Sequence, residues 1–405
     1  MKITQISTRA WPYHAGLEEF LYTLSKQLVS SGNDITLLAT NSSGEYSAPQ
    51  IRLGRLPINR KQESYPSGIS QINDVFRIHR AKIYLRVGPF HLTESLWHQL
   101  AKDSDTLHLH SMTDLPFWFP IIQRAKNKKL VLTIHDVAPS VANKTEITFW
   151  EPYTKLLVPE LLKKFHWIIV PSLAQIEFLK SKGCEHKRVS LIPLCYDEQV
   201  KKVKDEGDNR QATRYRYGVE PDDFLIISVG RLIPVKRFDL LLRALSSVTK
   251  NPGLCPIRCL IIGPDEGSLT QLVRLSEQLG ISNRVHFLGI RTHMETLRLI
   301  KAADLFVMPS ADEAFNLSTV ESMALSVPVL VSTGVGVSYL IRNNENGATF
   351  KRNDLEDLTE ALSHLVKNRD RLRLLAFEGK KTADSCCSPE AVSKKYLEVY
   401  KRLAA

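Results

Sequence analysis

Residues 304–321 read Asp-Leu-Phe-Val-Met-Pro-Ser-Ala-Asp-Glu-Ala-Phe-Asn-Leu-Ser-Thr-Val-Glu, and their pattern indicates the fold class. Its apolar run at 305–308 predicts a buried strand, and residues 318–324 predict a helix. A strand, a loop and a helix in this order belong to a βαβ unit. Glu313 falls in the loop and Glu321 about one turn inside the helix. Both therefore follow the carboxyl end of a strand, where open parallel sheets bind ligands.

The same alternation recurs along the chain in two series. Short β-branched runs alternate with longer amphipathic stretches, which is typical of parallel α/β sheets. The chain has 405 residues, too many for one ordinary core. We therefore predict two Rossmann-like domains, 1–200 and 201–387, and expect a helix within 388–405 to pack back on the first. The predicted strands are 3–8, 34–40, 106–110, 130–135, 167–171, 189–192, 224–229, 258–262, 285–288, 305–308 and 329–331.

Two regions interrupt the alternation. Residues 41–100 are rich in Gly, Pro, Ser and Arg, and we predict mainly loops there. Residues 196–216 are polar and predict a connector between the domains. The predicted helices include 17–31, 238–248, 269–279, 297–302 and 391–403.

The composition is that of a soluble globular protein, with 43% apolar and 24% charged residues. No apolar run is long enough to cross a bilayer. The start, Met1 to Ser7, predicts a strand and not an export signal. Six scattered cysteines have no zinc or disulfide spacing. These features favour a cytoplasmic protein without a metal site.

Part of the net charge of +11 is concentrated. Residues 51–86 hold eight cations against two anions, and Arg124, Lys126, Lys128 and Lys129 form a second cluster. Such patches attract anionic lipid or an acidic acceptor. A solvated basic face is an equally good interpretation. Nucleic acid is disfavoured, because no reading motif accompanies the charge.

Cationic side chains follow the predicted strand 224–229. Gly230 and Arg231 come directly after it, and Lys236 stands five residues further on. Glycine permits close backbone approach to a ligand. Arginine can grip a diphosphate bidentately, and lysine adds a point charge. Together they could neutralise a leaving nucleoside diphosphate without a metal. On this fragment alone, two surface cations in a βα loop explain the pattern equally well.

The two glutamates also allow two interpretations. Paired carboxylates can accept hydrogen bonds from several sugar hydroxyls. Alternatively, Ser318 and Glu321 have the S-x-x-E spacing of a capping box, which would make Glu321 a structural residue.

Further glycine turns and histidines end other predicted strands. Thr-Gly-Val-Gly at 333–336 is suited to cradling phosphate. Gly16 closes the stretch 12–16 before a helix whose N-terminus offers an anion site. His135 ends the strand 130–135, and its position alone favours a buried structural histidine over a catalytic one. We expect His108 and His110 to be structural as well.

In combination these residues resemble the retaining glycosyltransferases of family 4. Gly230 to Lys236 looks like the family's G-R-L-x-x-x-K motif, and residues 261–267 resemble its G-P-D-E-G turn. Residues 284–289 are similar to its R-V-x-F-x-G strand, and Glu313 to Glu321 to its Glu-x7-Glu motif. The resemblance spans nearly the whole chain and implies the GT-B fold, two Rossmann-like domains facing across a cleft.

The resemblance also implies roles for individual residues. Arg231 and Lys236 would hold the donor diphosphate, Glu313 the hydroxyls of the transferred sugar, and Glu321 the ribose. His135 would lie near the transferred sugar. The implied catalytic residues are Glu313, His135, Arg231 and Lys236, and the implied donor-binding residues are Gly16, Gly230, Arg231, Lys236, Glu313, Phe315, Asn316, Leu317 and Glu321.

Several positions depart from the family pattern. Ala15 and Asn316 stand where the family usually has glycine, and so does Val335. Asparagine tolerates a positive φ better than most residues, so we expect Asn316 to keep the loop geometry. Val335 could not adopt such a conformation comfortably. We therefore expect a donor pocket that differs in detail from that of the relatives.

The resulting hypothesis is a retaining, metal-independent transferase that needs no cofactor. It would use a UDP- or GDP-sugar and a lipid-linked, polysaccharide or other glycan acceptor. Its expected place is the cytoplasm, with a peripheral contact to the anionic inner face of the membrane as one interpretation. A nucleotide-sugar epimerase, a sugar phosphorylase and a non-catalytic GT-B partner subunit are the alternatives.

Overall fold

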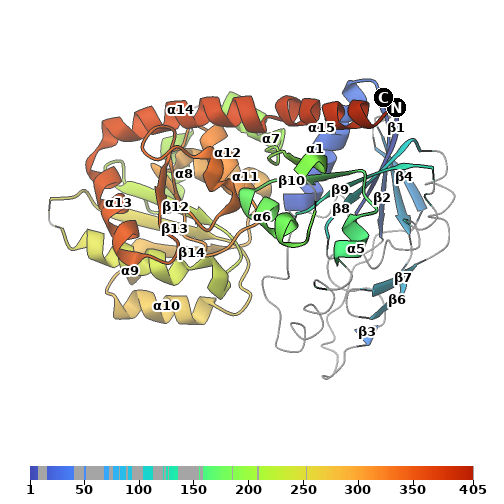
Figure 1. Cartoon of the computed structure of the whole chain (residues 1–405). Helices are drawn as coiled ribbons and strands as arrows, with labels where there is room; N and C mark the ends of the chain where they lie inside the picture. Colours follow the sequence, from blue (N-terminus) through green and yellow to red (C-terminus); the bar gives the residue numbers. More distant parts are fainter. Residues whose placement is uncertain are drawn as a thin grey trace. The chain divides into compact units, whose positions relative to one another are not determined.

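The computed structural model divides the chain into two compact units (Figure 1). Unit 1 comprises Met1–Pro193 and Val392–Ala405, and unit 2 comprises Leu194–Ala391. The structure describes residues 1–7, 16–40, 50–51, 68–72, 76–81, 83–87, 90–93, 104–112, 122, 125, 127–135, 155, 158–184, 186–207, 209–251 and 253–404. Within these residues, no helix is both long enough and apolar enough to span a membrane.

The described part of unit 1 contains an eight-stranded sheet of order β11-β10-β9-β8-β1-β2-β5-β4. Neighbouring strands are parallel except for β4 and β5, which are antiparallel. The strands are β1 (Lys2–Ile6), β2 (Asp34–Thr40), β4 (Gly68–Ile72), β5 (Phe76–Ala81), β8 (Thr106–His110), β9 (Lys129–Thr133), β10 (Trp167–Val170) and β11 (Val189–Leu191).

The region predicted as loops, 41–100, contains strands. Besides β4 and β5 it holds β3 (Gln50–Ile51), β6 (Ile83–Val87) and β7 (Phe90–Thr93), which form a second small sheet. The prediction of loops was therefore wrong for these residues. Their alternation is masked by arginines and glycines, so no long apolar run marks the strands.

The two faces of the unit 1 sheet carry different residues, because successive side chains of a strand point to opposite sides. On one face, Leu107, Leu109 and Leu132 pack with α5 (Val158–Leu162) and α6 (Leu173–Ser181). On the other, α1 (Gly16–Ser30) packs on β2 and β5, and α15 (Pro389–Ala404) reaches the polar residues of β8 and β9.

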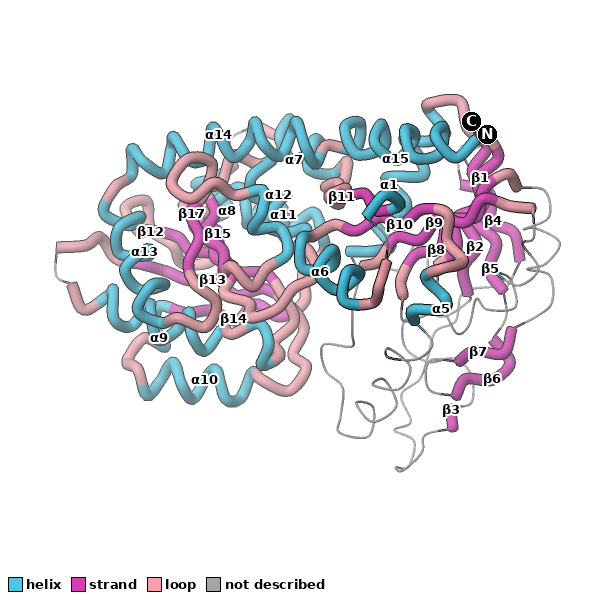
Figure 2. Tube along the Cα trace, viewed as in Figure 1, coloured by secondary structure: helices cyan, strands magenta, loops and turns pink. Residues whose placement is uncertain are grey.

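Unit 2 contains, in its described residues, a parallel sheet of order β14-β13-β12-β15-β16-β17. Its strands are β12 (Phe224–Val229), β13 (Ile257–Ile262), β14 (Val285–Gly289), β15 (Leu305–Met308), β16 (Val329–Ser332) and β17 (Ala348–Phe350). Because all six run in one direction, the loops that follow them lie at one edge of the sheet. Figure 2 shows these strands with helices on both sides.

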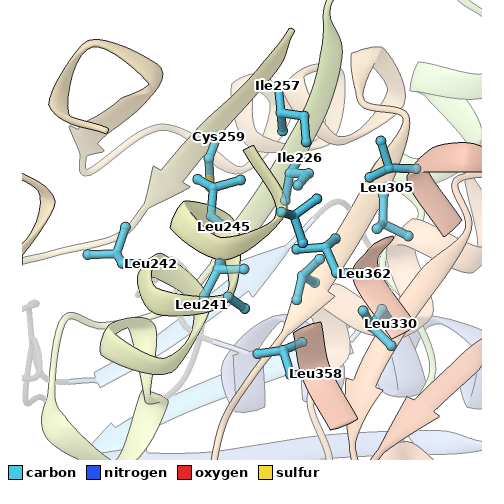
Figure 3. Close-up of a cluster of buried hydrophobic side chains, with 14 of the residues drawn as sticks. Ile226, Leu241, Leu242, Leu245, Ile257, Cys259, Leu305, Leu330, Leu358 and Leu362 are labelled. Atoms are coloured by element: carbon cyan, nitrogen blue, oxygen red, sulfur yellow. The ribbon is translucent and has the colours of Figure 1, made fainter. Parts of the chain in front are cut away.

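The main core cluster of unit 2 lies against one face of this sheet, and Leu372 and Leu375 of α14 (Arg369–Cys387) belong to it together with residues of three other helices. α9 (Phe238–Thr249), α10 (Leu269–Gln278) and α13 (Leu355–Lys367) cover the face from which Ile226, Cys259 and Leu305 project. Figure 3 shows these residues meeting Leu241, Leu245 and other side chains of the helices. The remaining helices include α11 (His293–Ala302) and α12 (Leu317–Ala324).

The predicted connector 196–216 is largely helical. It forms α7 (Gln199–Asp205) and α8 (Arg210–Arg216), and both belong to unit 2. Arg214 donates to Asp304 at 3.1 Å, and Lys301 donates to the carbonyl of Val203 at 2.6 Å. Long-range ion pairs and carbonyl contacts thus hold these polar helices in unit 2.

Candidate functional site

The turn after β12 brings a buried cation to the carboxyl edge of the unit 2 sheet. Lys236 ends the short 3₁₀ helix η3 (Pro234–Lys236), and its side chain is 11% exposed. It lies along Gly230, where an added Cβ would come within 3.3 Å of the lysine Cε. A side chain at position 230 would therefore press on Lys236, which explains the glycine.

Lys236 forms an ion pair with Oε1 of Glu313, whose side chain is 16% exposed. The two residues come from the loops after β12 and β15, which are neighbours in the sheet. The backbone joins the loops as well, since the amide of Ala311 donates to the carbonyl of Val235 at 2.8 Å. A cation and a carboxylate are thus held together at the edge where parallel sheets bind ligands.

The loop from Glu313 to Asn316 is held by the turn after β16. The amide of Gly336 donates to the carbonyl of Glu313 at 2.9 Å, and the amide of Val337 donates to that of Phe315 at 2.9 Å. Phe315 is 2% exposed and anchors the loop in the core. Gly334 is required here, because a Cβ on it would lie 2.2 Å from the carbonyl oxygen of Ala311.

Asn316 adopts a φ of 90°, as its side chain permits, and starts α12. Its Oδ1 accepts a hydrogen bond from the amide of Thr319 at 2.9 Å, and Leu317 is the first helical residue. The capping-box interpretation of Ser318 and Glu321 was wrong, because the cap lies two residues before Ser318. The concern over Val335 was also unfounded, since its φ is −92°.

Glu321 lies in the second turn of α12 and is held by a residue that the sequence did not single out. Nε2 of His293 lies 2.9 Å from Oε1 of Glu321, and the two side chains are 22% and 7% exposed. His293 is the first residue of α11. The available signal was Thr292-x-x-Glu295, a capping box that starts this helix four residues before the predicted 297.

Arg231 is the exposed cation of the site. It pairs with Glu266 at 3.0 Å, and both side chains are nearly half exposed. Such a surface pair contributes little stability, so Arg231 can exchange Glu266 for a better anion. Its turn is fixed by the amide of Leu232, which donates to the carbonyl of Pro264 at 2.8 Å.

Gly16 and His135 lie in unit 1, whereas all the other candidate residues lie in unit 2. Gly16 is the first residue of α1, and residues 12–15 of the predicted anion loop lie outside the described residues. His135 follows β9, and its Nε2 lies 3.1 Å from Nδ1 of His110. The rings of His110 and His108 approach to 4.0 Å between centroids.

His108 ties this cluster to α15. Its Nδ1 lies 2.6 Å from the hydroxyl of Tyr400, and its Nε2 lies 2.7 Å from Oγ1 of Thr133. Tyr396 of the same helix lies 3.4 Å from Oγ1 of Thr133. The expectation of a structural role for His108 agrees with its complete burial and with these contacts.

Burial keeps the histidine cluster neutral. It lowers the pKa of His135 to about 3. It also lowers the pKa values of His108 and His110 well below the ordinary range, with the neighbouring histidines adding to the effect. At neutral pH His135 therefore carries no positive charge, and with Nε2 on His110, Nδ1 is its ring nitrogen without a hydrogen-bond partner among the described residues.

We expect the free energy of unfolding to fall as the pH falls from 6.5 toward 3. In this pH range histidines of the unfolded chain bind protons, whereas the buried histidines of the folded protein do not. The free energy of unfolding therefore begins to fall at the pKa of histidine in the unfolded chain. For His135 alone the effect is about 2 kcal/mol at pH 5 relative to pH 7.5. Urea unfolding at both pH values checks this. His135→Asn should reduce the difference in the free energy of unfolding between the two pH values, whereas replacement of the exposed His364 by alanine should not. The same difference in the wild type and both variants would contradict the prediction.

Comparison with known proteins gives two family matches and many structural neighbours. The model "Glycosyltransferase Family 4" matches residues 14–200, and the model "Glycosyl transferases group 1" matches residues 209–382. The D-inositol 3-phosphate glycosyltransferases of Nocardia farcinica and Rhodococcus erythropolis are 32% and 34% identical over 199 and 203 residues. These alignments cover 48% and 49% of this chain and 43% and 45% of the relatives, less than half of their length.

The structural neighbours establish the fold. Sucrose-phosphate synthase from Thermosynechococcus elongatus covers 99% of this chain and 98% of its own, with a TM-score of 0.73 at 18% identity. The Anabaena protein HepE, solved with UDP-glucose, covers 99% and 100% with a TM-score of 0.72 at 17% identity. The predicted α/β fold of GT-B type is thereby confirmed.

Proposed function

Because the chain belongs to the glycosyltransferases of family 4, matched by one family model in each half, we propose that it transfers a sugar from a nucleotide-sugar donor with retention of configuration. The acceptor is a lipid-linked, polysaccharide or other glycan. The observation that carries the proposal is the ion pair of Lys236 and Glu313 at the carboxyl edge of the unit 2 sheet. The UDP-glucose in HepE of Anabaena supports a nucleotide-sugar donor.

Binding of such a donor gives each member of this ion pair a new partner. The diphosphate offers oxygens to Lys236 and Arg231, and the sugar offers hydroxyls to Glu313. Each buried charge therefore keeps a partner when the donor binds. A buried charge without a partner would cost several kcal/mol. Glu321 accepts from the ribose. Gly230 lets the diphosphate approach the backbone, and Asn316 and Leu317 place the first amides of α12 beside the same edge.

In the proposed reaction the acceptor oxygen attacks the anomeric carbon on the same face of the sugar from which the phosphate leaves. The bond from that carbon to the phosphate oxygen breaks, and the phosphate takes the acceptor proton. Negative charge grows on the diphosphate as it leaves, so the cations Lys236 and Arg231 stabilise the transition state more than the ground state. His135, being neutral, positions a sugar hydroxyl and does not supply a charge.

We expect transfer to proceed with retention and in the presence of EDTA, because protein cations take the place of a metal on the diphosphate. Nuclear magnetic resonance of the product's anomeric proton checks the stereochemistry. An inverted product would overturn the proposed mechanism, and complete loss of turnover in EDTA that Mg²⁺ restores would overturn the role given to the cations.

Product analysis also separates the alternatives. An epimerase consumes donor without an acceptor, a phosphorylase requires free phosphate, and a partner subunit binds nucleotide without turnover. Two of the residues that replace a usual glycine, Asn316 and Val335, adopt conformations that suit them, and the third, Ala15, lies outside the described residues.

The two basic clusters, residues 51–86 and 124–129, lie largely outside the described residues. Among those described, Arg77 pairs with Asp34 at 3.1 Å, and Lys128 donates to the carbonyl of Ser104 at 2.6 Å. Peripheral contact with an anionic membrane at the cytoplasmic face therefore stays a prediction, which vesicle binding at two salt concentrations tests.

A further inference from the structure

The two carboxylate oxygens of Glu321 differ in their contacts: among the described residues Oε1 has a hydrogen-bond partner and Oε2 has none. Its side chain is 7% exposed, and Oε1 lies 2.9 Å from Nε2 of His293. Within the described part of the chain, no hydrogen bond or ion pair engages Oε2. Its lone pairs therefore stay available to a ligand that donates a hydrogen bond.

His293 is placed by the start of its helix. Oγ1 of Thr292 accepts from the amide of Glu295 at 3.2 Å, and Oε2 of Glu295 accepts from the amide of Thr292 at 3.0 Å. This capping box fixes the backbone at His293, just as the cap by Asn316 fixes the start of the helix that carries Glu321. Two capped helix starts therefore hold both ends of the contact.

We infer that His293 is a positioning residue of the nucleotide site. By holding Oε1 it fixes the rotamer of Glu321 and leaves Oε2 to accept a hydrogen bond from a ribose hydroxyl. The inference rests on the proposed function, which assigns the ribose to Glu321. If the inference holds, His293 affects nucleotide binding only through the contact between Glu321 and a ribose hydroxyl. The effect of replacing His293 therefore depends on whether the nucleotide carries that hydroxyl.

Isothermal titration calorimetry with UDP and GDP, and with their 2′-deoxy and 3′-deoxy analogues, tests this. His293→Ala should weaken the preferred ribonucleotide about tenfold, the cost of a disturbed hydrogen bond to a charged group. His293→Gln can still present an amide N–H to Glu321 and should bind nearly as the wild type does. For the deoxy analogue that lacks the recognised hydroxyl, the wild type and His293→Ala should bind alike.

The matched control is His364→Ala, an exposed histidine of α13, which should leave every affinity unchanged. Equal weakening of ribonucleotides and deoxynucleotides by His293→Ala would indicate a general structural role and overturn the inference. Unchanged ribonucleotide affinity in His293→Ala, or a wild type that does not discriminate deoxynucleotides, would overturn it too. In each of these cases the transferase proposal stands. A wild type that binds neither UDP nor GDP would instead remove the proposed donor class, and the inference with it.

Discussion

Replacing Lys236 with alanine should lower kcat for sugar transfer about a hundred- to a thousandfold, the usual cost of removing one preorganised electrostatic contact. Lys236 is 11% exposed and cannot be replaced by a mobile ion or by water without losing that preorganisation. Steady-state kinetics with the donor and acceptor used by the wild-type enzyme measure the effect. The matched control is Lys180→Ala, which removes an exposed lysine paired with Glu177 on α6. This substitution should leave kcat unchanged.

Lys236→Ala also leaves Glu313 without its cation, so part of the loss could come from a weakened fold. Glu313→Gln perturbs the pair less, since it keeps the volume of the side chain and an amide oxygen that can still accept a hydrogen bond from Lys236. We expect this variant to remain folded and to lose at least about tenfold in kcat, because an amide is a weaker acceptor for sugar hydroxyls than a carboxylate. Wild-type turnover in both variants would show that the ion pair is not part of the site.

Replacing Gly263 with alanine should destabilise unit 2 by about 3 kcal/mol or more, among the largest effects of a single substitution. Gly263 follows β13 with a φ of 148°, and an added Cβ would lie 2.0 Å from the carbonyl oxygen of Gly230. That carbonyl belongs to the turn that carries Arg231 and Lys236. The clash is with a backbone carbonyl, which cannot rotate away as the end of a flexible side chain can. The turn that carries Arg231 and Lys236 would therefore have to move.

A glycine series makes this prediction specific. Gly267 has a φ of 104° but open space around its Cβ position, so Gly267→Ala should cost only backbone strain, about 1 kcal/mol. Gly207 has open space and no positive φ, and Gly207→Ala should be neutral. Urea unfolding followed by circular dichroism ranks the three variants. Equal midpoints for Gly263→Ala and Gly207→Ala would contradict the structure.

The sequence predicted the unit 2 strands well, because parallel buried strands read as short apolar runs. The predicted 224–229 and 305–308 coincide with β12 and β15. Helix starts were less predictable, since a cap is a local contact between side chain and backbone. Ser318-x-x-Glu321 has the spacing of a capping box and is not one, whereas Thr292-x-x-Glu295 forms one and was overlooked.

That misplaced start is why one residue of the candidate site was missed. With α11 predicted from 297, His293 belonged to a loop and had no reason to face Glu321. Contacts between elements were beyond the sequence pattern in general. Lys236 and Glu313 were each singled out, but as separate binders of phosphate and sugar, and their mutual ion pair follows only from the neighbouring positions of β12 and β15. The alternating hydrophobic pattern does not encode which strands are neighbours.

The two-piece make-up of unit 1 affects the order in which the protein can be completed during synthesis. A ribosome delivers residues 1–193 first, and domains generally begin to fold as they emerge. Yet the hydroxyl that meets His108 belongs to Tyr400, 292 positions further on, and Tyr396 and Tyr400 are both fully buried. The domain that begins first is therefore finished last, after the whole of unit 2 has left the ribosome.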